Sequence, residues 1–394
     1  MQYASLEHWV NINSGSLNPE GLRLMADALA EHLSGIPGPI ERITLPEFRE
    51  LDGSVIHPGD VLRLRFRSEA PVQVLFSGHM DTVFDKNHSF QRLRMLEDGK
   101  ANGPGVTDMK GGLFIMLEAV EQFLRENRSG TLGGEILITA DEEIGSPASR
   151  DLILEAAGRA HLGLVFESAL PGGELVCARK GTGTYQVRTR GKAAHTGRDF
   201  RAGRNAIVAL SDFLLRCHAL NESFEDAVVN VGRINGGGAV NVVPDKAEGW
   251  LNVRASHEST GNQIERALHD MVGESQARWK GVSFSLEGGF TRPPKEESKG
   301  DATLYRIWNT IEHGLGFPES GKRETGGSSD GNLLSQAGLP HLDGIGIRGN
   351  YIHSENEYAL LESIPEQIAK TVAFLHHFAD SPALVATPPL QKPS

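Results

Sequence analysis

Histidine and acidic residues follow a predicted β-strand of this 394-residue chain at the point where the strand ends. His79 and Asp81 come just after the apolar run at residues 72–76, and Asp108 lies in a glycine- and proline-rich loop ahead of a predicted helix. Imidazole nitrogens and carboxylate oxygens are ligands that a divalent ion such as Zn²⁺ accepts in proteins. This stretch therefore predicts half of a metal site.

Two further predicted strands end in acidic residues. The apolar run at residues 135–140 leads into Glu142 and Glu143, and the run at residues 162–166 leads into Glu167. A solvated loop or a helix N-cap explains any single acidic strand end equally well. Several such ends favour a shared site, because ligands of α/β sheets collect at the carboxyl ends of the strands.

The surrounding segments alternate between strand and helix patterns. Residues 19–33 and 110–127 predict helices. The alternating run at residues 61–66 predicts a half-exposed strand that pairs with the buried strand at residues 72–76. This alternation predicts an α/β catalytic domain with a mixed central sheet that is at least partly parallel.

The pattern changes near residue 178. From residue 178 to 292 the expected order is strand, helix, two strands, helix and strand, which is the ferredoxin-like arrangement. We therefore expect residues 1–177 and 293–394 to form the two parts of the catalytic domain, and residues 178–292 to form an inserted α+β domain. The run at residues 293–301 predicts the linker back.

The last segment adds a histidine and a flexible-looking loop. His353 lies in the loop GNYIHSENEY, where a lone histidine is more simply a surface side chain. The loop at residues 325–332 contains Gly327 and Ser328. Its backbone N–H groups could bind a carboxylate, or the loop could be a plain linker.

Charge and cysteine content restrict the partners. The formal net charge of −12 disfavours nucleic acid and anionic membranes, so an anionic small substrate must meet locally placed cations. The two cysteines, Cys177 and Cys217, are too few for a disulfide framework. The sequence shows no signal-peptide pattern and no apolar run of membrane-spanning length, so we expect a reduced, cytoplasmic setting.

Eight motifs together resemble the two-zinc aminoacylase and carboxypeptidase family of metallopeptidases. In chain order they are GHMDTV, NGPGVTDMKGG, ADEEIGS, FES, GKAAHTG, GRINGGGAVNVVPDKAEGWLNVR, ETGGSSDGN and YIHSENEY. The resemblance covers nearly the whole chain and is greatest to glutamate carboxypeptidase-like members. It implies a two-zinc exopeptidase-like catalytic domain and an inserted domain through which two chains form a homodimer.

The resemblance implies two Zn²⁺ ions per chain, with Co²⁺ or Mn²⁺ as alternatives. The implied ligands are His79, Asp108, Glu143, Glu167 and His353. Asp108 would bridge the ions, and the peptide bond between Asp108 and Met109 is expected to be cis. Asp81 would hold the other ring nitrogen of His79, a role that the His-x-Asp spacing also favours.

The same resemblance identifies Glu142 as the general base. Two adjacent carboxylates at one strand end can point differently, so Glu143 can bind metal while Glu142 faces a water that bridges the ions. Such a water has its pKa lowered toward neutrality, and a carboxylate can take its proton and return it to the leaving amine. A solvated acid at a helix start is the alternative role of Glu142.

The resemblance also implies contacts between the inserted domain and the substrate. His195 would donate to the tetrahedral oxyanion, reaching the site of the partner subunit. Asn241 and Arg254 match positions that bind the substrate's carboxylate or carbonyl group. An arginine fork suits a carboxylate on chemical grounds, although a plain surface salt bridge is the alternative for Arg254.

These features predict hydrolysis of the amide bond between an acyl or aminoacyl group and a C-terminal amino acid. Glu167 leaves the substrate open, because glutamate carboxypeptidases usually carry Asp there and acetylornithine deacetylase-like members carry Glu. An N-acetyl or N-succinyl amino-acid deacylase is therefore the alternative. A non-catalytic metabolite-binding relative is a further alternative, which the complete set of ligands disfavours. Nucleotide binding is disfavoured, since Asp108 occupies the third glycine position of G-x-G-x-x-G.

Overall fold

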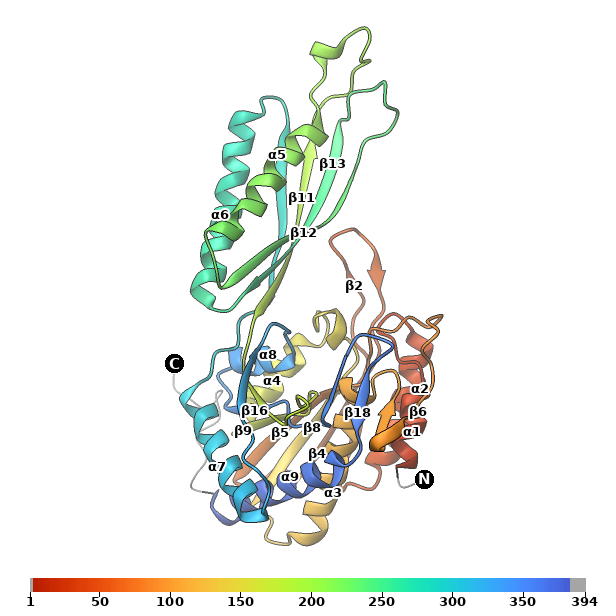
Figure 1. Cartoon of the computed structure of the whole chain (residues 1–394), viewed down its shortest axis with the longest axis vertical. Coiled ribbons are helices and arrows are strands. Elements are labelled where there is room, and N and C mark those ends of the chain that lie inside the picture. Colours follow the sequence, from red (N-terminus) through yellow and green to blue (C-terminus); the bar gives the residue numbers. More distant parts are fainter. Residues whose placement is uncertain (1–2, 383–394) are drawn as a thin grey trace.

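The computed structural model describes residues 3–382. Figure 1 shows two units, a lower one around a six-stranded sheet and an upper one around a four-stranded sheet, joined by extended strands. No helix in residues 3–382 combines the length and the apolar character needed to cross a membrane. The α-helices are α1 (Ala4–Val10), α2 (Pro19–Leu33), α3 (Gly111–Glu126), α4 (Arg150–Arg159), α5 (Ala206–Ala219), α6 (Glu258–Arg278), α7 (Lys299–Leu315), α8 (Asp330–Gln336) and α9 (Ser363–Asp380).

The strands belong to several sheets of different size. They are β1 (Ile40–Ile43), β2 (Phe48–Arg49), β3 (Val55–Ile56), β4 (Val61–Phe66), β5 (Val72–His79), β6 (Arg94–Met95), β7 (Lys100–Asn102), β8 (Leu132–Thr139), β9 (Leu162–Val165), β10 (Leu175–Arg179), β11 (Gly181–Arg190), β12 (Ala227–Gly236), β13 (Lys246–Ala255), β14 (Ser283–Arg292), β15 (Lys322–Thr325), β16 (His341–Asp343), β17 (Gly349–Asn350) and β18 (Tyr358–Leu360).

The central sheet is mixed, with the strand order β1-β4-β8-β5-β9-β16. β5, β8, β9 and β16 run parallel, whereas the pairs β1–β4 and β4–β8 are antiparallel. The predicted pairing of residues 61–66 with residues 72–76 is wrong, because β8 lies between β4 and β5. All of β8 is buried, so it takes a position in the sheet with a partner on each edge.

Alternate side chains of β5 face two hydrophobic cores. Val74 and Phe76 pack in the core that includes residues of α3 and α9, and Leu75 packs in the core that includes residues of α4 and α8. Successive side chains of a strand point to opposite faces, so a strand covered on both faces is apolar throughout. The buried strand predicted at residues 72–76 is confirmed.

The parallel strands end at one edge of the central sheet. β5 ends at His79, which pairs with Thr139 at the end of β8, and Ser77 of β5 pairs with Val165 at the end of β9. The loops that follow these strands therefore start side by side. They carry Asp81, Glu142, Glu143 and Glu167.

The upper unit has the antiparallel strand order β12-β13-β11-β14, and it contains α5 and α6 (Figure 1). Its own core includes Val187, Leu210 and Leu251. The element order is the predicted ferredoxin-like arrangement, and the predicted fold class is confirmed.

We propose residues 178–292 as the inserted domain and residues 1–177 and 293–394 as the two parts of the catalytic domain. Residues 383–394 lie outside the described part of the chain. The run at residues 293–301 is not a free linker. Lys295 is buried there, and its Nζ lies 2.9 Å from Asp343 Oδ2.

A small antiparallel sheet, β17-β18-β7-β6, brings the C-terminal segment to the edge where the parallel strands end. The loop between β17 and β18 carries His353, and β18 pairs with β7, which precedes Asp108 in the chain. His353 has a φ of 62°, a conformation uncommon for a residue other than glycine. This sheet therefore joins His353 to the Asp108 loop.

Candidate metal centre and active site

His79 lies inside a buried cluster of carboxylates. Its Nε2 atom lies 3.3 Å from Asp108 Oδ1 and 3.7 Å from Glu167 Oε1. On the other side of the ring, Nδ1 lies 3.1 Å from the backbone oxygen of Asp81, its hydrogen-bond partner, and 3.3 Å from Asp81 Oδ1. His79 is only 1% exposed. One ring nitrogen faces Asp81, and the other faces the carboxylates of Asp108 and Glu167.

Asp81 holds several parts of the site at once. Its buried carboxylate accepts a hydrogen bond from Ser16 Oγ (2.7 Å) and from the backbone N–H groups of Glu142 (3.2 Å) and Glu143 (3.1 Å). A carboxylate beside a ligating histidine fixes the orientation of the ring. Asp81 therefore orients both His79 and the turn that carries the two glutamates.

Asp108 faces a histidine with each of its two oxygens. Oδ1 faces His79, whereas Oδ2 lies 3.2 Å from His353 Nε2. The same His353 nitrogen lies 3.2 Å from Glu143 Oε2. The peptide bond between Asp108 and Met109 is cis, as expected. A carboxylate placed in this way can bridge two ions.

Glu357 holds the Asp108 loop from behind. Its fully buried carboxylate accepts hydrogen bonds from the backbone N–H groups of Gly105 (3.0 Å), Thr107 (2.8 Å) and Asp108 (3.1 Å). Burial raises the pKa of Glu357 to about 7, against the effect of these hydrogen bonds. Glu357 is not among the site residues predicted from the sequence, although it lies in the motif YIHSENEY.

The pKa values of the cluster reflect an excess of buried negative charge. Burial and the neighbouring carboxylate of Asp108 raise the pKa of Glu143 to about 8, and burial raises the pKa of Glu167 well above its ordinary value. Hydrogen bonds to Asp108 and Glu143 raise the pKa of His353 to about 11. The buried carboxylates are stabilised by positive charge nearby. Divalent cations can supply that charge in place of protons.

The donor atoms fit divalent ions. His79 Nε2 and Asp108 Oδ1 are buried without a hydrogen-bond partner among the described residues. Two groups of three side chains bring their ligand atoms within 4.8 Å of one another: His79 with Glu142 and Glu167, and His79 with Asp108 and Glu143. Imidazole and carboxylate ligands suit Zn²⁺, Co²⁺ and Mn²⁺.

Glu142 differs from the other predicted site carboxylates because it pairs with an arginine. Its Oε1 atom lies 2.8 Å from Arg292 Nη1, an ion pair whose geometry falls outside that of a hydrogen bond. Its Oε2 atom lies 3.8 Å from His79 Nε2. Burial raises the pKa of Glu142 to about 7, and Arg292 opposes this shift. A carboxylate with such a pKa can exchange protons near neutral pH.

Arg254 and Ser328, both predicted to bind substrate, lie together. Arg254 Nη1 donates to Ser328 Oγ (3.3 Å), and its Nε donates to Asn252 (3.2 Å). Both partners are neutral, and no carboxylate of the described residues pairs with Arg254. Burial and the nearby Arg292 lower its pKa. Gly327 is exposed in the same loop.

A family model supports the interpretation of this site as enzymatic. The model of "Peptidase family M20/M25/M40" matches residues 75–381. The chain belongs to this family. The M20 assignment confirms the resemblance predicted from the motifs, and with it a hydrolase of the metallopeptidase type.

Individual M20 relatives are similar over most of their length. Carboxypeptidase G2 of Pseudomonas sp. (strain RS-16) is 28% identical over 92% of this chain and 86% of its own. Succinyl-diaminopimelate desuccinylase of Acinetobacter baumannii (strain ACICU) is 28% identical over 76% of this chain and 82% of its own. The solved structure of the M20 metallo-carboxypeptidase Sso-CP2 from Sulfolobus solfataricus matches with a TM-score of 0.73 at 17% identity, over 96% and 99% of the two chains.

His195 and Asn241 of this M20 chain lie together, but not at the carboxylate cluster. His195 forms an isolated β-bridge with Val242, and the backbone N–H of Thr196 donates to Asn241 O (3.0 Å). Figure 1 shows the segments that follow β11 and β12 at the end of the inserted unit remote from the central sheet. The structure of one chain therefore does not unite these two residues with the predicted ligands.

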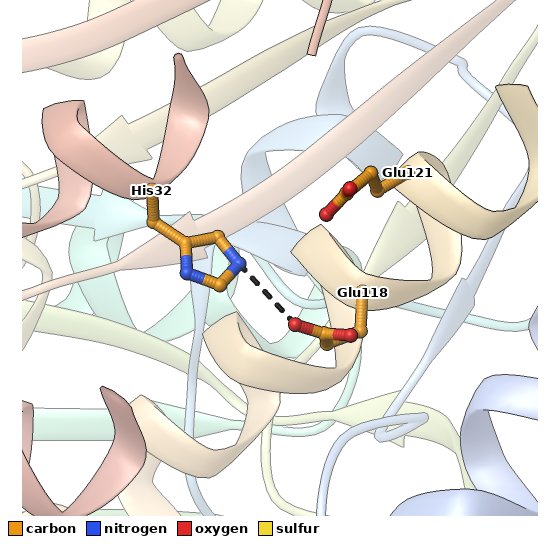
Figure 2. Close-up of side chains that lie close together, drawn as sticks. All are labelled: His32, Glu118 and Glu121. Atoms are coloured by element: carbon orange, nitrogen blue, oxygen red, sulfur yellow. Dashed lines mark ion pairs between the residues drawn. The ribbon is translucent and has the colours of Figure 1, made fainter. Parts of the chain in front are cut away.

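A second group of possible metal-binding side chains is half-buried between α2 and α3. Figure 2 shows His32 of α2 pointing at Glu118 of α3, with Glu121 nearby. His32 Nε2 lies 3.4 Å from Glu118 Oε1, and the His32 ring packs edge-on against Trp9. Glu121 pairs with Arg125 at 2.8 Å. Packing and ordinary ion pairs explain these side chains, so we assign no metal to them.

Proposed function

We propose that this M20 hydrolase cleaves the amide bond that links an acyl or aminoacyl group to a C-terminal amino acid. One observation carries the proposal: among residues 3–382 Arg254 has no acidic partner, and it lies near Arg292, which pairs with the buried Glu142. The arginine fork and Ser328 can bind the free carboxylate of the substrate. The similarity to carboxypeptidase G2 supports this reaction.

We propose that the cluster holds two divalent ions, Zn²⁺ in the first place, with Co²⁺ or Mn²⁺ as alternatives. His79 and Glu167 would hold one ion, Glu143 and His353 the other, and Asp108 both. When bound, the ions supply Lewis acidity toward the amide carbonyl and an attacking water. Asp81 would keep the His79 ring in the orientation that ligation requires.

Glu142 moves the proton in this proposal. With Oε1 on Arg292, its Oε2 atom faces the cluster and can take a proton from the attacking water. The same oxygen then returns the proton to the nitrogen of the leaving amino acid. No covalent intermediate with the protein is required.

Replacing Arg254 by methionine should raise KM for substrates with a free carboxylate. A hydrogen bond to a charged group contributes about 1.5–3 kcal/mol, so kcat/KM should fall roughly 10- to 100-fold. Steady-state kinetics on a substrate and on its carboxamide analogue checks this. The fall should vanish with the carboxamide, and the exposed Arg266→Met variant on α6 should behave like the wild type. An equal fall with both substrates would contradict the assignment.

We propose that the chain forms a homodimer in which His195 serves the partner subunit's site. His195→Ala should then lower kcat about 10²- to 10³-fold, as loss of an oxyanion donor does. Mixing His195→Ala chains with Glu142→Gln chains should restore about a quarter of wild-type activity, because half of the dimers then contain one complete site. No recovery after verified chain exchange would contradict action across the interface.

Substrate hydrolysis tests the proposed reaction. The metal-loaded protein should be offered N-benzoyl, N-acetyl and N-succinyl derivatives of glutamate and of basic amino acids, together with dipeptides. Release of free glutamate from the glutamate derivatives would support carboxypeptidase activity. Glu167 favours the alternative, an N-acetyl or N-succinyl deacylase, which would act on the acylated basic amino acids instead. No hydrolysis of any member would contradict both.

A further inference from the structure

Arg292 contacts both the side chain and the backbone of Glu142. Nη1 lies 2.8 Å from Glu142 Oε1, and Nη2 donates to the Glu142 carbonyl oxygen (2.9 Å). Arg292 is only 3% exposed. A planar guanidinium that meets one residue at two points restricts that residue more than a single contact would.

Asp330 holds the same guanidinium through Nη2. Arg292 Nη2 lies 3.0 Å from Asp330 Oδ1 and donates to Ser146 Oγ (2.6 Å). Asp330 is 2% exposed and also accepts hydrogen bonds from Ser146 Oγ and from Thr139 Oγ1 (3.2 Å). Moving Arg292 away from Glu142 would also leave the buried carboxylate of Asp330 without its cation. This double pairing holds the guanidinium in place.

The contact with Arg292 gives the two carboxylate oxygens of Glu142 different surroundings. Oε1 is occupied by Arg292, whereas Oε2 faces the cluster at 3.8 Å from His79 Nε2. A free glutamate side chain has several rotamers, and fixing one costs up to about 2 kcal/mol. The ion pair supplies that restriction before any substrate binds, and such preorganisation favours proton transfer.

We propose that Arg292 is a positioning residue, which holds Glu142 in the rotamer that transfers the proton. The inference rests on the proposed function, since it gives Glu142 the role of general base. Arg292 is the last residue of β14 and pairs in register with Thr182 of β11. The residue that positions the base therefore lies where the chain leaves the inserted unit.

A double-mutant cycle tests the proposal. Glu142→Gln, Arg292→Gln and the double variant should be compared in kcat, KM, metal content per chain and crystal structure. We expect Arg292→Gln to lower kcat about 10²-fold, because misplacement by about 1 Å has that effect, with KM and metal content little changed. In the Glu142→Gln background the same replacement should change kcat less than about threefold, since groups that act as a unit are not additive. The exposed Arg323→Gln variant is the matched control.

The results distinguish the positioning role of Arg292 from the proposed role of Glu142 as the general base. Additive losses in the cycle, or a Glu142 rotamer unchanged in the Arg292→Gln crystal structure, would overturn the positioning role alone. Full activity of Glu142→Gln would overturn the proposed function itself. If Arg292→Gln does not fold, Arg292→Lys replaces it. That variant keeps a cation beside Oε1 but loses the second contact, so we expect a smaller loss of kcat that again disappears beside Glu142→Gln.

Discussion

Replacing Glu142 by glutamine should lower kcat by about 10²- to 10⁴-fold, the usual contribution of a general base. Glutamine keeps the size of the side chain and an oxygen that can face Arg292, but its amide cannot accept a proton from water. The predicted ligands are untouched, so the number of ions per chain should stay at that of the wild type. Steady-state kinetics and elemental analysis on the same preparation measure both quantities.

A matched control separates this effect from the loss of a charge in general. Glu31 lies exposed on α2, and Glu31→Gln should leave kcat and KM at wild-type values. If Glu142→Gln lost ions along with activity, Glu142 would be a ligand rather than the base. This outcome is a real alternative, because Glu142 also lies within ligand distance of His79 and Glu167.

Replacing Asp343 by alanine should lower the free energy of unfolding by about 3–5 kcal/mol, the cost of leaving buried charges unpaired. Asp343 accepts two hydrogen bonds from Arg179 (2.8 and 2.7 Å) and one from Lys295 (2.9 Å). Burial raises the pKa of Asp343, but the two cations outweigh it and hold the pKa below its ordinary value. Denaturant unfolding monitored by circular dichroism gives the free energy.

Asp27 provides the comparison for this replacement. It also pairs with two cations, Arg23 (2.8 Å) and Arg42 (2.7 Å), but its side chain is 46% exposed. Surface ion pairs contribute about 0–1 kcal/mol, so Asp27→Ala should cost far less. Equal losses for the two variants would show that burial does not govern the effect.

The predicted ligands could be found from the sequence because each follows a strand end or belongs to a motif. Asp108, for example, lies in NGPGVTDMKGG, and the adjacent cis peptide was expected from the resemblance. The parallel strands then bring these ends to one edge of the sheet. Periodicity predicted the strand ends, whereas the choice of ligands, His353 included, came from the family resemblance and stays a prediction.

The residues that hold the ligands could not be found in the same way. Arg292 meets Glu142 across 150 residues of sequence, and Glu357 meets Thr107 across 250. Nothing in the sequence next to Arg292 distinguishes it from a surface arginine at a strand end. Such contacts depend on tertiary packing, which no local pattern encodes.

The order of strands was also beyond local pattern. The run at residues 61–66 is adjacent in sequence to β5, and neighbours in sequence often pair in a sheet. The strand β8, which is buried at every position, lies between them. Which strand pairs with β5 can be decided only when all strands of the sheet are considered together. The element types, by contrast, follow from periodicity, as in α2, whose bounds match the predicted helix at residues 19–33.

We propose that Asp108 bridges two ions while Glu142 binds none. Anomalous diffraction from crystals of the zinc-loaded protein tests this most directly. We predict two peaks per chain, one beside His79 and Glu167 and one beside Glu143 and His353, with Asp108 between them. A single peak, or a peak ligated by Glu142 in place of Asp108, would contradict the account.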